Sequence, residues 1–169
     1  LLRDLGSALA PDNAFAIIQG LETVALRMKQ HCQNAEKVVN FLKKHKEVTK
    51  VIYSTEHDKQ IANRAKQYLR GGNGPMVGIE LKGGIEAGKK FIESLKMFYH
   101  VANIGDARSL AIHPASTTHS QLNEKELVAS GVTQSYVRLC IGLEHIDDII
   151  DDLDQALNKS SKGKLKAVS

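Results

Sequence analysis

Residues 75–82, PMVGIELK, alternate between apolar and other side chains, and residues 136–141, YVRLCI, repeat the pattern. Successive side chains of a β-strand point to opposite faces of the sheet. Both segments therefore predict strands, each with one apolar face. The residues on these faces are Val77, Ile79 and Leu81 in the first segment and Val137, Leu139 and Ile141 in the second.

Two shorter segments, 48–53 and 109–113, are also predicted as strands. In the second of these we expect Leu110 and Ile112 on the apolar face and Ser109 on the opposite one. Helices are predicted over 58–69, 85–95, 123–130 and 145–157, and in 58–69 and 145–157 apolar residues recur at helical spacing. The helix over 123–130 has Asn123 as its candidate N-cap, with Glu126 three residues on, as in a capping box. Residues 12–44 predict one long helix or two joined helices, with Gly20 as a weak point.

The sheet faces opposite to the apolar ones decide the expected architecture. An ordinary solvent face is rich in Lys, Glu and Thr, whereas these faces hold small residues and a single arginine. We therefore expect an α+β two-layer domain: a small, mainly antiparallel sheet with helices on one face, a long N-terminal helix, and a second sheet face that meets another segment or domain. A sparse solvent face remains the alternative. The residues concerned are Met76, Gly78, Glu80, Ser109, Ala111, His113, Tyr136, Arg138 and Cys140.

The composition limits the class of protein. With 169 residues, 42% of them hydrophobic and 25% charged, the chain has the size of one globular domain. The net charge of +4 is dispersed and there is no Trp, so no nucleic-acid partner is expected. The apolar runs are far shorter than the roughly 18 residues that span a bilayer. The chain begins at Leu1 rather than Met, as we expect of a piece of a longer protein.

Residues 83–90, GGIEAGKK, match the GxxxxGK pattern of phosphate-binding loops but fail it at two positions. Lys90 stands where a Ser or Thr hydroxyl is needed, and Glu86 places a negative charge where phosphate would lie. We interpret the segment as a turn from a strand into a helix, in which glycines supply unusual backbone angles.

Neither a metal site nor a catalytic nucleophile is expected. No histidine or cysteine pair has the spacing that places both ligands on one helix face. The acidic residues of 145–157 are predicted to face water, namely Asp147, Asp148, Asp151, Asp152 and Asp154. No signature base accompanies the possible nucleophiles, which are Ser109, Ser116, Ser120, Cys32 and Cys140. Two cysteines do not make a disulfide framework, so a reducing compartment is expected, with Cys140 as a small buried residue.

Arg138 is the strongest candidate for a binding residue. A guanidinium on the non-core face of a strand is a rigid fork that can hold a carboxylate through two parallel hydrogen bonds. The alternative is a structural ion pair with Glu80 or Glu144.

Four segments carry a resemblance: LRDLGSALAPDNAFAIIQGLETVALRMKQHCQNA (2–35), KGGIEAGKK (82–90), FIESLKMFYHVANIGDARSLAIHPASTTHSQL (91–122) and VRLCIGLEHIDDIIDDLDQAL (137–157). Together they resemble the C-terminal domain of O-acetylhomoserine sulfhydrylases, which belong to the pyridoxal-phosphate-dependent enzymes of cysteine and methionine metabolism. The resemblance extends from Leu2 to Leu157 and so implies the C-terminal domain of a fold-type I enzyme.

The resemblance implies a γ-replacement. Acetate leaves Cγ of O-acetylhomoserine, and sulfide or a thiol adds to give homocysteine or a thioether. The arginine of the VRLxxGxE motif, Arg138 here, is expected to bind the substrate α-carboxylate, and Ser109 and Leu110 of the RSLxxHPA motif to lie beside it. The predicted strand faces place Ser109 and Arg138 together. Cys140 stands where relatives commonly have Ser.

The resemblance also implies a domain organisation. Residues 1–158 are expected to form the substrate-side domain, with a connecting helix region over 1–44, an α+β body over 45–158 and a basic, frayed tail over 159–169. The motifs that hold pyridoxal phosphate in this family, including its lysine, do not occur in this sequence. We therefore expect the cofactor to be bound by a missing N-terminal domain, with no catalytic or cofactor-binding residue here and no activity from this chain alone.

The parent enzyme is expected to be a cytoplasmic homotetramer that acts on the amino-acid substrate O-acetylhomoserine in methionine biosynthesis, without metal, membrane or nucleic acid. Two alternatives stay open. One is the same domain of a cystathionine γ-synthase or methionine γ-lyase, and the other is a non-catalytic carboxylate-binding or interaction module.

Overall fold

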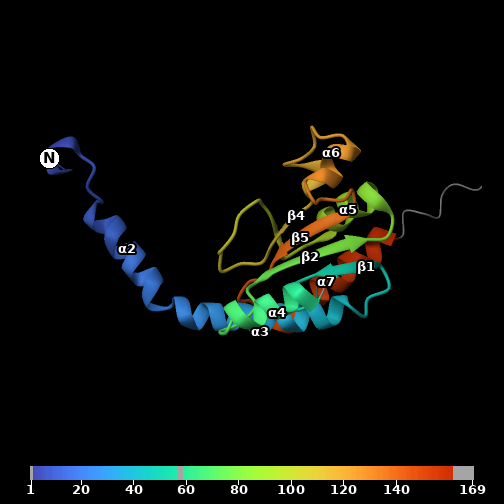
Figure 1. Cartoon of the computed structure of the whole chain (residues 1–169), viewed down its shortest axis with the longest axis horizontal. Helices are drawn as coiled ribbons and strands as arrows, with labels where there is room; N and C mark the ends of the chain where they lie inside the picture. The colour runs from blue at the N-terminus through green and yellow to red at the C-terminus, as the bar shows by residue number, and fades with distance from the viewer. Residues whose placement is uncertain (1, 57–58, 162–169) are drawn as a thin grey trace, which may run out of the picture.

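Five strands form one sheet in a computed structural model that describes residues 2–56 and 59–161 (Figure 1). The order is β1-β2-β5-β4-β3, and neighbours are antiparallel except for the parallel pair β3 and β4. This confirms the predicted mainly antiparallel sheet. The strands are β1 (Val48–Ile52), β2 (Met76–Leu81), β3 (Tyr99–His100), β4 (Leu110–Ile112) and β5 (Tyr136–Cys140).

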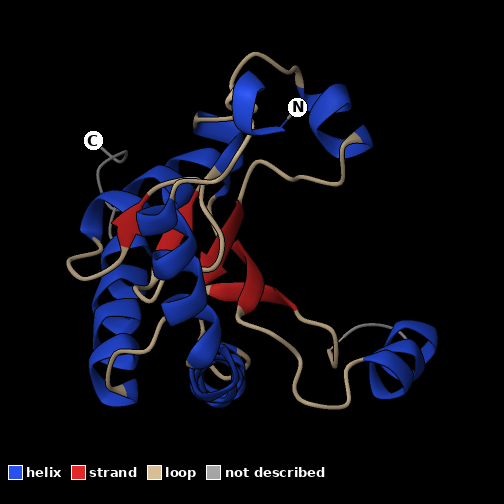
Figure 2. Cartoon of the chain, turned by 90° about the vertical axis from the view of Figure 1, so that its left-hand side faces the viewer, coloured by secondary structure: helices blue, strands red, loops and turns tan. Residues whose placement is uncertain are grey.

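Three helices cover one face of the sheet, and this layer can be followed in Figure 2. They are α3 (Val24–Leu42), α5 (Gly84–Ser94) and α7 (Ile146–Ser161). The alternating residues predicted for β2 and β5 meet them in a closed core, and burial of each such side chain contributes about 1.5–3 kcal/mol. The central members are Val77, Ile79, Val137 and Leu139 from the sheet and Leu42, Phe91, Leu153 and Leu157 from the helices, all fully buried.

The N-terminal region consists of two joined helices rather than one. Helix α2 (Pro11–Glu22) begins with Pro at its first position and ends at Thr23, where α3 starts, so the chain breaks there and not at Gly20. No residue of α2 is buried, and Figure 1 shows α2 projecting from the body. A short helix, α1 (Leu2–Leu5), precedes it.

The remaining elements are short. Helix α4 (Lys59–Tyr68) buries only Ala65, and a 3-10 turn, η1 (Pro114–Ser116), follows β4. Helix α6 (Glu124–Ala129) begins with the predicted capping box, because Asn123 and Glu126 each accept a backbone N–H from the other. Positive φ angles of +105° at Gly83 and +66° at Gly84 confirm the predicted glycine turn ahead of α5.

Three features of the fold outside β4 differ from what the sequence predicted. Strand β3 was not predicted, because its two residues are exposed and make no apolar pattern. Asp152 does not face water: it is 7% exposed and its carboxylate accepts the backbone N–H groups of Lys96 and Met97 at 2.9 Å. Residues 159–161 belong to α7 rather than to a frayed tail, and the rest of that predicted tail lies outside the described residues. Within residues 2–56 and 59–161, no helix is both long and apolar enough to cross a membrane.

Candidate substrate carboxylate site

Arg138 lies on the sheet face opposite to α3, α5 and α7. In the strand register it stands between Gly78 of β2 and Ile112 of β4, and Ile52 of β1 continues the row beyond Gly78. Its chain neighbours Val137 and Leu139 are fully buried in the helix-covered core. The face predicted for Arg138 is therefore confirmed.

The guanidinium of Arg138 has no carboxylate partner among the described residues. Its Nη2 donates one hydrogen bond, 3.3 Å long, to the carbonyl oxygen of Asn103. The two carboxylates considered as partners are engaged elsewhere, since Glu80 lies 3.7 Å from Nζ of Lys50 and Glu144 binds Ser109. An arginine with spare donors on a half-buried surface can accept an external carboxylate in its fork.

A hollow of about 240 Å³ lies beside Arg138 on the same face. Gly78 lies in it and has no room for a side chain, because a Cβ there would be 2.7 Å from a ring carbon of Tyr136. Burial raises the pKa of Tyr136, and the nearby charge of Arg138 opposes this shift. The Oγ of Ser54 is buried without a hydrogen-bond partner. Ile52 and Met76 complete an apolar wall.

This hollow combines one cation, two hydroxyl groups and an apolar wall, a combination that suits a small molecule bearing a carboxylate. Sequence reasoning did not single out Tyr136 or Ser54. For Tyr136 the signal was present, since it shares the strand face of Arg138 by alternation. For Ser54 the sequence contained no such signal, because Ser54 lies beyond the end of β1 and strand alternation does not place its side chain.

Ser109 does not share the face of Arg138, and this prediction was wrong. The register pairs Ile112 with Arg138 and Ala111 with Leu139, so Leu110 and Ile112 lie on the face of Arg138. Ala111 joins the helix-covered core, and Ser109 shares its side by alternation. All three residues of β4 are buried, so the apolar residues of this strand do not mark the core side.

The structure thus brings Leu110 and Arg138 to one face and separates the Ser109 side chain from both. Leu110 is 2% exposed and pairs with Cys140, which is 1% exposed, as expected for a small buried residue. Ser109 is fully buried, and its hydroxyl donates to Oε2 of Glu144 at 2.9 Å.

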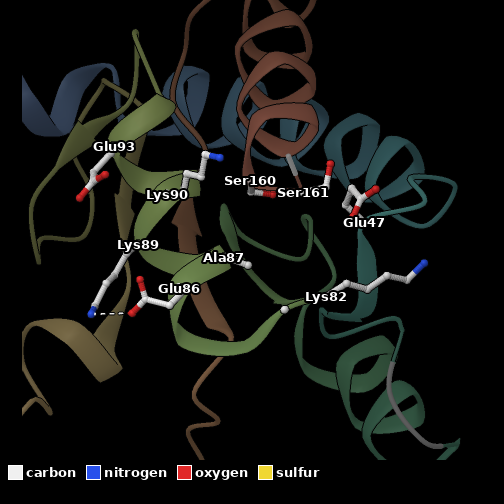
Figure 3. A pocket seen from close by; sticks show the side chains of 10 residues that line it. Glu47, Lys82, Glu86, Ala87, Lys89, Lys90, Glu93, Ser160 and Ser161 are labelled. Atoms are coloured by element: carbon white, nitrogen blue, oxygen red, sulfur yellow. Dashed lines mark hydrogen bonds and ion pairs between the residues drawn. The ribbon is translucent and has the colours of Figure 1, made fainter. Parts of the chain in front are cut away.

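A larger cavity, about 620 Å³, lies elsewhere, between α5, the end of α7 and the start of β1 (Figure 3). Its charged side chains are of both signs, and Nζ of Lys89 bonds Oε1 of Glu86 at 2.9 Å. They are Glu47, Lys82, Glu86, Lys89, Lys90 and Glu93. The part of the chain that the structure describes contains no group of three metal-ligating side chains.

Comparisons with known proteins agree on one family. The model of the Cys/Met metabolism PLP-dependent enzymes, where PLP is pyridoxal phosphate, matches residues 1–158. The O-acetyl-L-homoserine sulfhydrylase of Leptospira meyeri is 54% identical over 92% of this chain and 36% of its own length. The L-methionine gamma-lyase of Fusobacterium nucleatum subsp. polymorphum is 43% identical over 94% of this chain and 40% of its own length.

A solved structure extends the likeness to the fold. A Campylobacter jejuni protein assigned as an O-acetylhomoserine (thiol)-lyase, which carries a pyridoxyl-lysine phosphate, matches with a TM-score of 0.82 at 46% identity. The match covers 93% of this chain and 37% of that one. The chain thus spans 36–40% of the length of these relatives. It belongs to the Cys/Met metabolism PLP-dependent enzyme family.

Proposed function

We propose that this chain is the C-terminal, substrate-binding part of an O-acetylhomoserine sulfhydrylase. The reaction converts O-acetylhomoserine and sulfide into homocysteine and acetate: the Cγ–O bond breaks, a Cγ–S bond forms, and acetate leaves with the electron pair. A thiol in place of sulfide gives a thioether. The proposed setting is a cytoplasmic homotetramer in methionine biosynthesis.

One observation carries the proposal: Arg138 presents unpaired donors beside a hollow on the sheet face opposite to α3, α5 and α7. Two parallel N–H···O bonds would fix the α-carboxylate in one plane and so orient Cα and Cγ of the substrate. Leu110 would pack beside that carboxylate from the neighbouring strand. Ser109 would support the same site indirectly, through its place immediately before β4.

We infer that the lysine and the other residues that hold pyridoxal phosphate are not among the described residues. The family's cofactor is held through a lysine in the Campylobacter jejuni structure, whereas every described lysine of this chain is exposed or half-buried at the surface. We therefore place the cofactor-binding residues in a part of the protein outside this chain, and expect the chain alone to be inactive.

Methionine γ-lyase is the second candidate, because that relative is 43% identical over 94% of the chain. A cystathionine γ-synthase would use the same carboxylate site. A non-catalytic carboxylate-binding module is the remaining alternative, since Arg138 alone would satisfy it.

The test is a substrate comparison with the full-length protein that contains this chain. We expect homocysteine from O-acetylhomoserine and sulfide at a rate far above the release of methanethiol from methionine. The reverse ratio would assign the γ-lyase reaction. Turnover of neither compound, with carboxylate binding retained, would identify a binding module and overturn the proposal.

A further inference from the structure

Every polar group of Ser109 is bonded within the chain. Its amide N–H donates to Oε1 of Glu144 at 2.7 Å, and its hydroxyl donates to Oε2 at 2.9 Å. Its Oγ accepts the N–H of Gly142 at 2.8 Å, and its carbonyl oxygen accepts the N–H of Tyr99 at 3.0 Å. A substrate carboxylate could bind Ser109 only by displacing the carboxylate of Glu144.

Helix α3 holds Glu144 in this position from the core side. Asn34, 1% exposed, donates from Nδ2 to the carbonyl oxygens of Gly142 and Glu144, both at 3.0 Å. His31, 3% exposed, donates from Nδ1 to the carbonyl oxygen of Ile141 at 2.7 Å. Gly142 has no room for a side chain, since a Cβ there would overlap Ser109 and Glu144.

The same bonds fix the surroundings of Arg138. The loop between β3 and β4 ends at Ser109. A hydrogen bond of 2.8 Å from the N–H of Leu143 to the carbonyl oxygen of Ala107 holds this loop in place. Within that loop, the carbonyl of Asn103 receives the hydrogen bond of Arg138. Strand β4, which starts after Ser109, places Ile112 beside Arg138. A shift of Ser109 would therefore move two neighbours of Arg138, the carbonyl of Asn103 and Ile112.

We propose that Glu144 and Ser109 are positioning residues for the carboxylate site, and that the Ser109 hydroxyl never contacts the substrate. This inference rests on the proposed function, because it takes Arg138 as the ligand of the α-carboxylate. Glu144 acts as a built-in carboxylate that satisfies Ser109 and holds β4 and its preceding loop against Arg138.

A double-mutant cycle on the full-length protein tests this, with KM and kcat measured for O-acetylhomoserine. Ser109→Ala and Glu144→Ala are each expected to raise KM about tenfold with kcat little changed, the size expected for loss of a hydrogen bond to a charged group. Because the two residues act through one contact, the double variant is expected to be no worse than Glu144→Ala. Glu144→Gln keeps the side-chain volume and one acceptor, so its KM is expected between those of wild type and Glu144→Ala.

The control is Glu126→Ala, which also removes a carboxylate from a backbone N–H, that of Asn123, but at α6. It is expected to lower stability and leave KM unchanged. If Ser109→Ala raises KM as much in the Glu144→Ala or Glu144→Gln background as alone, the hydroxyl touches substrate and the inference is wrong. If Arg138→Gln leaves KM unchanged, the carboxylate site of the proposed function itself fails.

Discussion

Gly88 of α5 lies under the imidazole of His113, so close that a Cβ on Gly88 would overlap the ring, with Cδ2 only 2.5 Å away. His113 is fully buried, donates from Nε2 to the carbonyl oxygen of Gln134 at 2.8 Å, and bonds Oγ of Ser116 through Nδ1 at 2.8 Å. Gly88, the third glycine of GGIEAGKK, therefore serves helix packing rather than phosphate binding. The contact joins α5 to the segment that follows β4.

Gly88→Ala is expected to destabilise the protein by about 1–3 kcal/mol, because a methyl group there must displace the buried His113 ring. The control is Gly20→Ala in α2, where a Cβ meets nothing within 4 Å and removal of a helical glycine is expected to be neutral or favourable. Urea unfolding of both variants measures the difference. Equal midpoints would contradict the packing role of Gly88.

Acid is expected to destabilise the folded chain through His113. Burial lowers the pKa of His113, the hydrogen bond to Gln134 opposes the shift, and the charge of Lys89 adds to it. Below the ordinary pKa of about 6.5 the unfolded state binds a proton that the folded state does not. The free energy of unfolding therefore falls as pH drops below about 6.5, by at most about 1.4 kcal/mol per pH unit, until the folded-state pKa is reached. In urea titrations between pH 7.5 and 5, His113→Gln should reduce the dependence of the free energy of unfolding on pH. An unchanged dependence would mean that other groups cause it.

Asp152→Ala is expected to cost about 3 kcal/mol of stability, because the backbone N–H groups of Lys96 and Met97 lose a buried charged acceptor. Asp151→Ala, the exposed neighbour on α7, is expected to change stability by less than about 0.5 kcal/mol. Thermal and urea unfolding of the pair give the comparison. A loss no larger for Asp152 than for Asp151 would show that water replaces the carboxylate at the end of α5.

Arg138→Lys is expected to raise KM for O-acetylhomoserine about tenfold in the full-length protein, with kcat little changed, since an ammonium group cannot form the two parallel bonds of a guanidinium. Arg70→Lys is the matched control, because the exposed Arg70 also donates to a single backbone carbonyl, that of Gln67. Steady-state kinetics of both variants measure the difference in KM. If Arg138→Lys keeps the wild-type KM, Arg138 does not bind the substrate carboxylate.

The isolated chain is expected to fold, because its core is closed, and to self-associate through α2. Phe15, Ile18 and Leu21 are 65%, 53% and 62% exposed, and exposed apolar patches drive association. Replacing the three by Ser should shift the chain towards monomer in sedimentation experiments over a range of concentrations. Val128→Ser on α6, a single apolar residue that is 64% exposed, should not. A wild-type chain that stays monomeric would rule out α2 as an interaction surface.

Most of the fold could be predicted from local patterns in the sequence. The alternation in 75–82 and 136–141 predicted β2, β5 and the core residues of both strands, because a sheet covered on one side imposes a period of two. The apolar stripe of 145–157 predicted α7 in the same way, and the spacing from Asn123 to Glu126 predicted the start of α6. Strand β3 has two residues, too few to show any period.

The sequence by itself determined strands β2 and β5, their core residues and the placement of Arg138 on the opposite face, because each follows from spacing within one element. Only the tertiary structure decided that Ser109 turns away from Arg138 and that Asp152 is buried. Ser109 meets Glu144 across 35 residues of sequence, and Asp152 meets Lys96 across 56. A polar side chain lies wherever its hydrogen bonds are satisfied, and for these residues the partners come from distant segments that no local pattern contains.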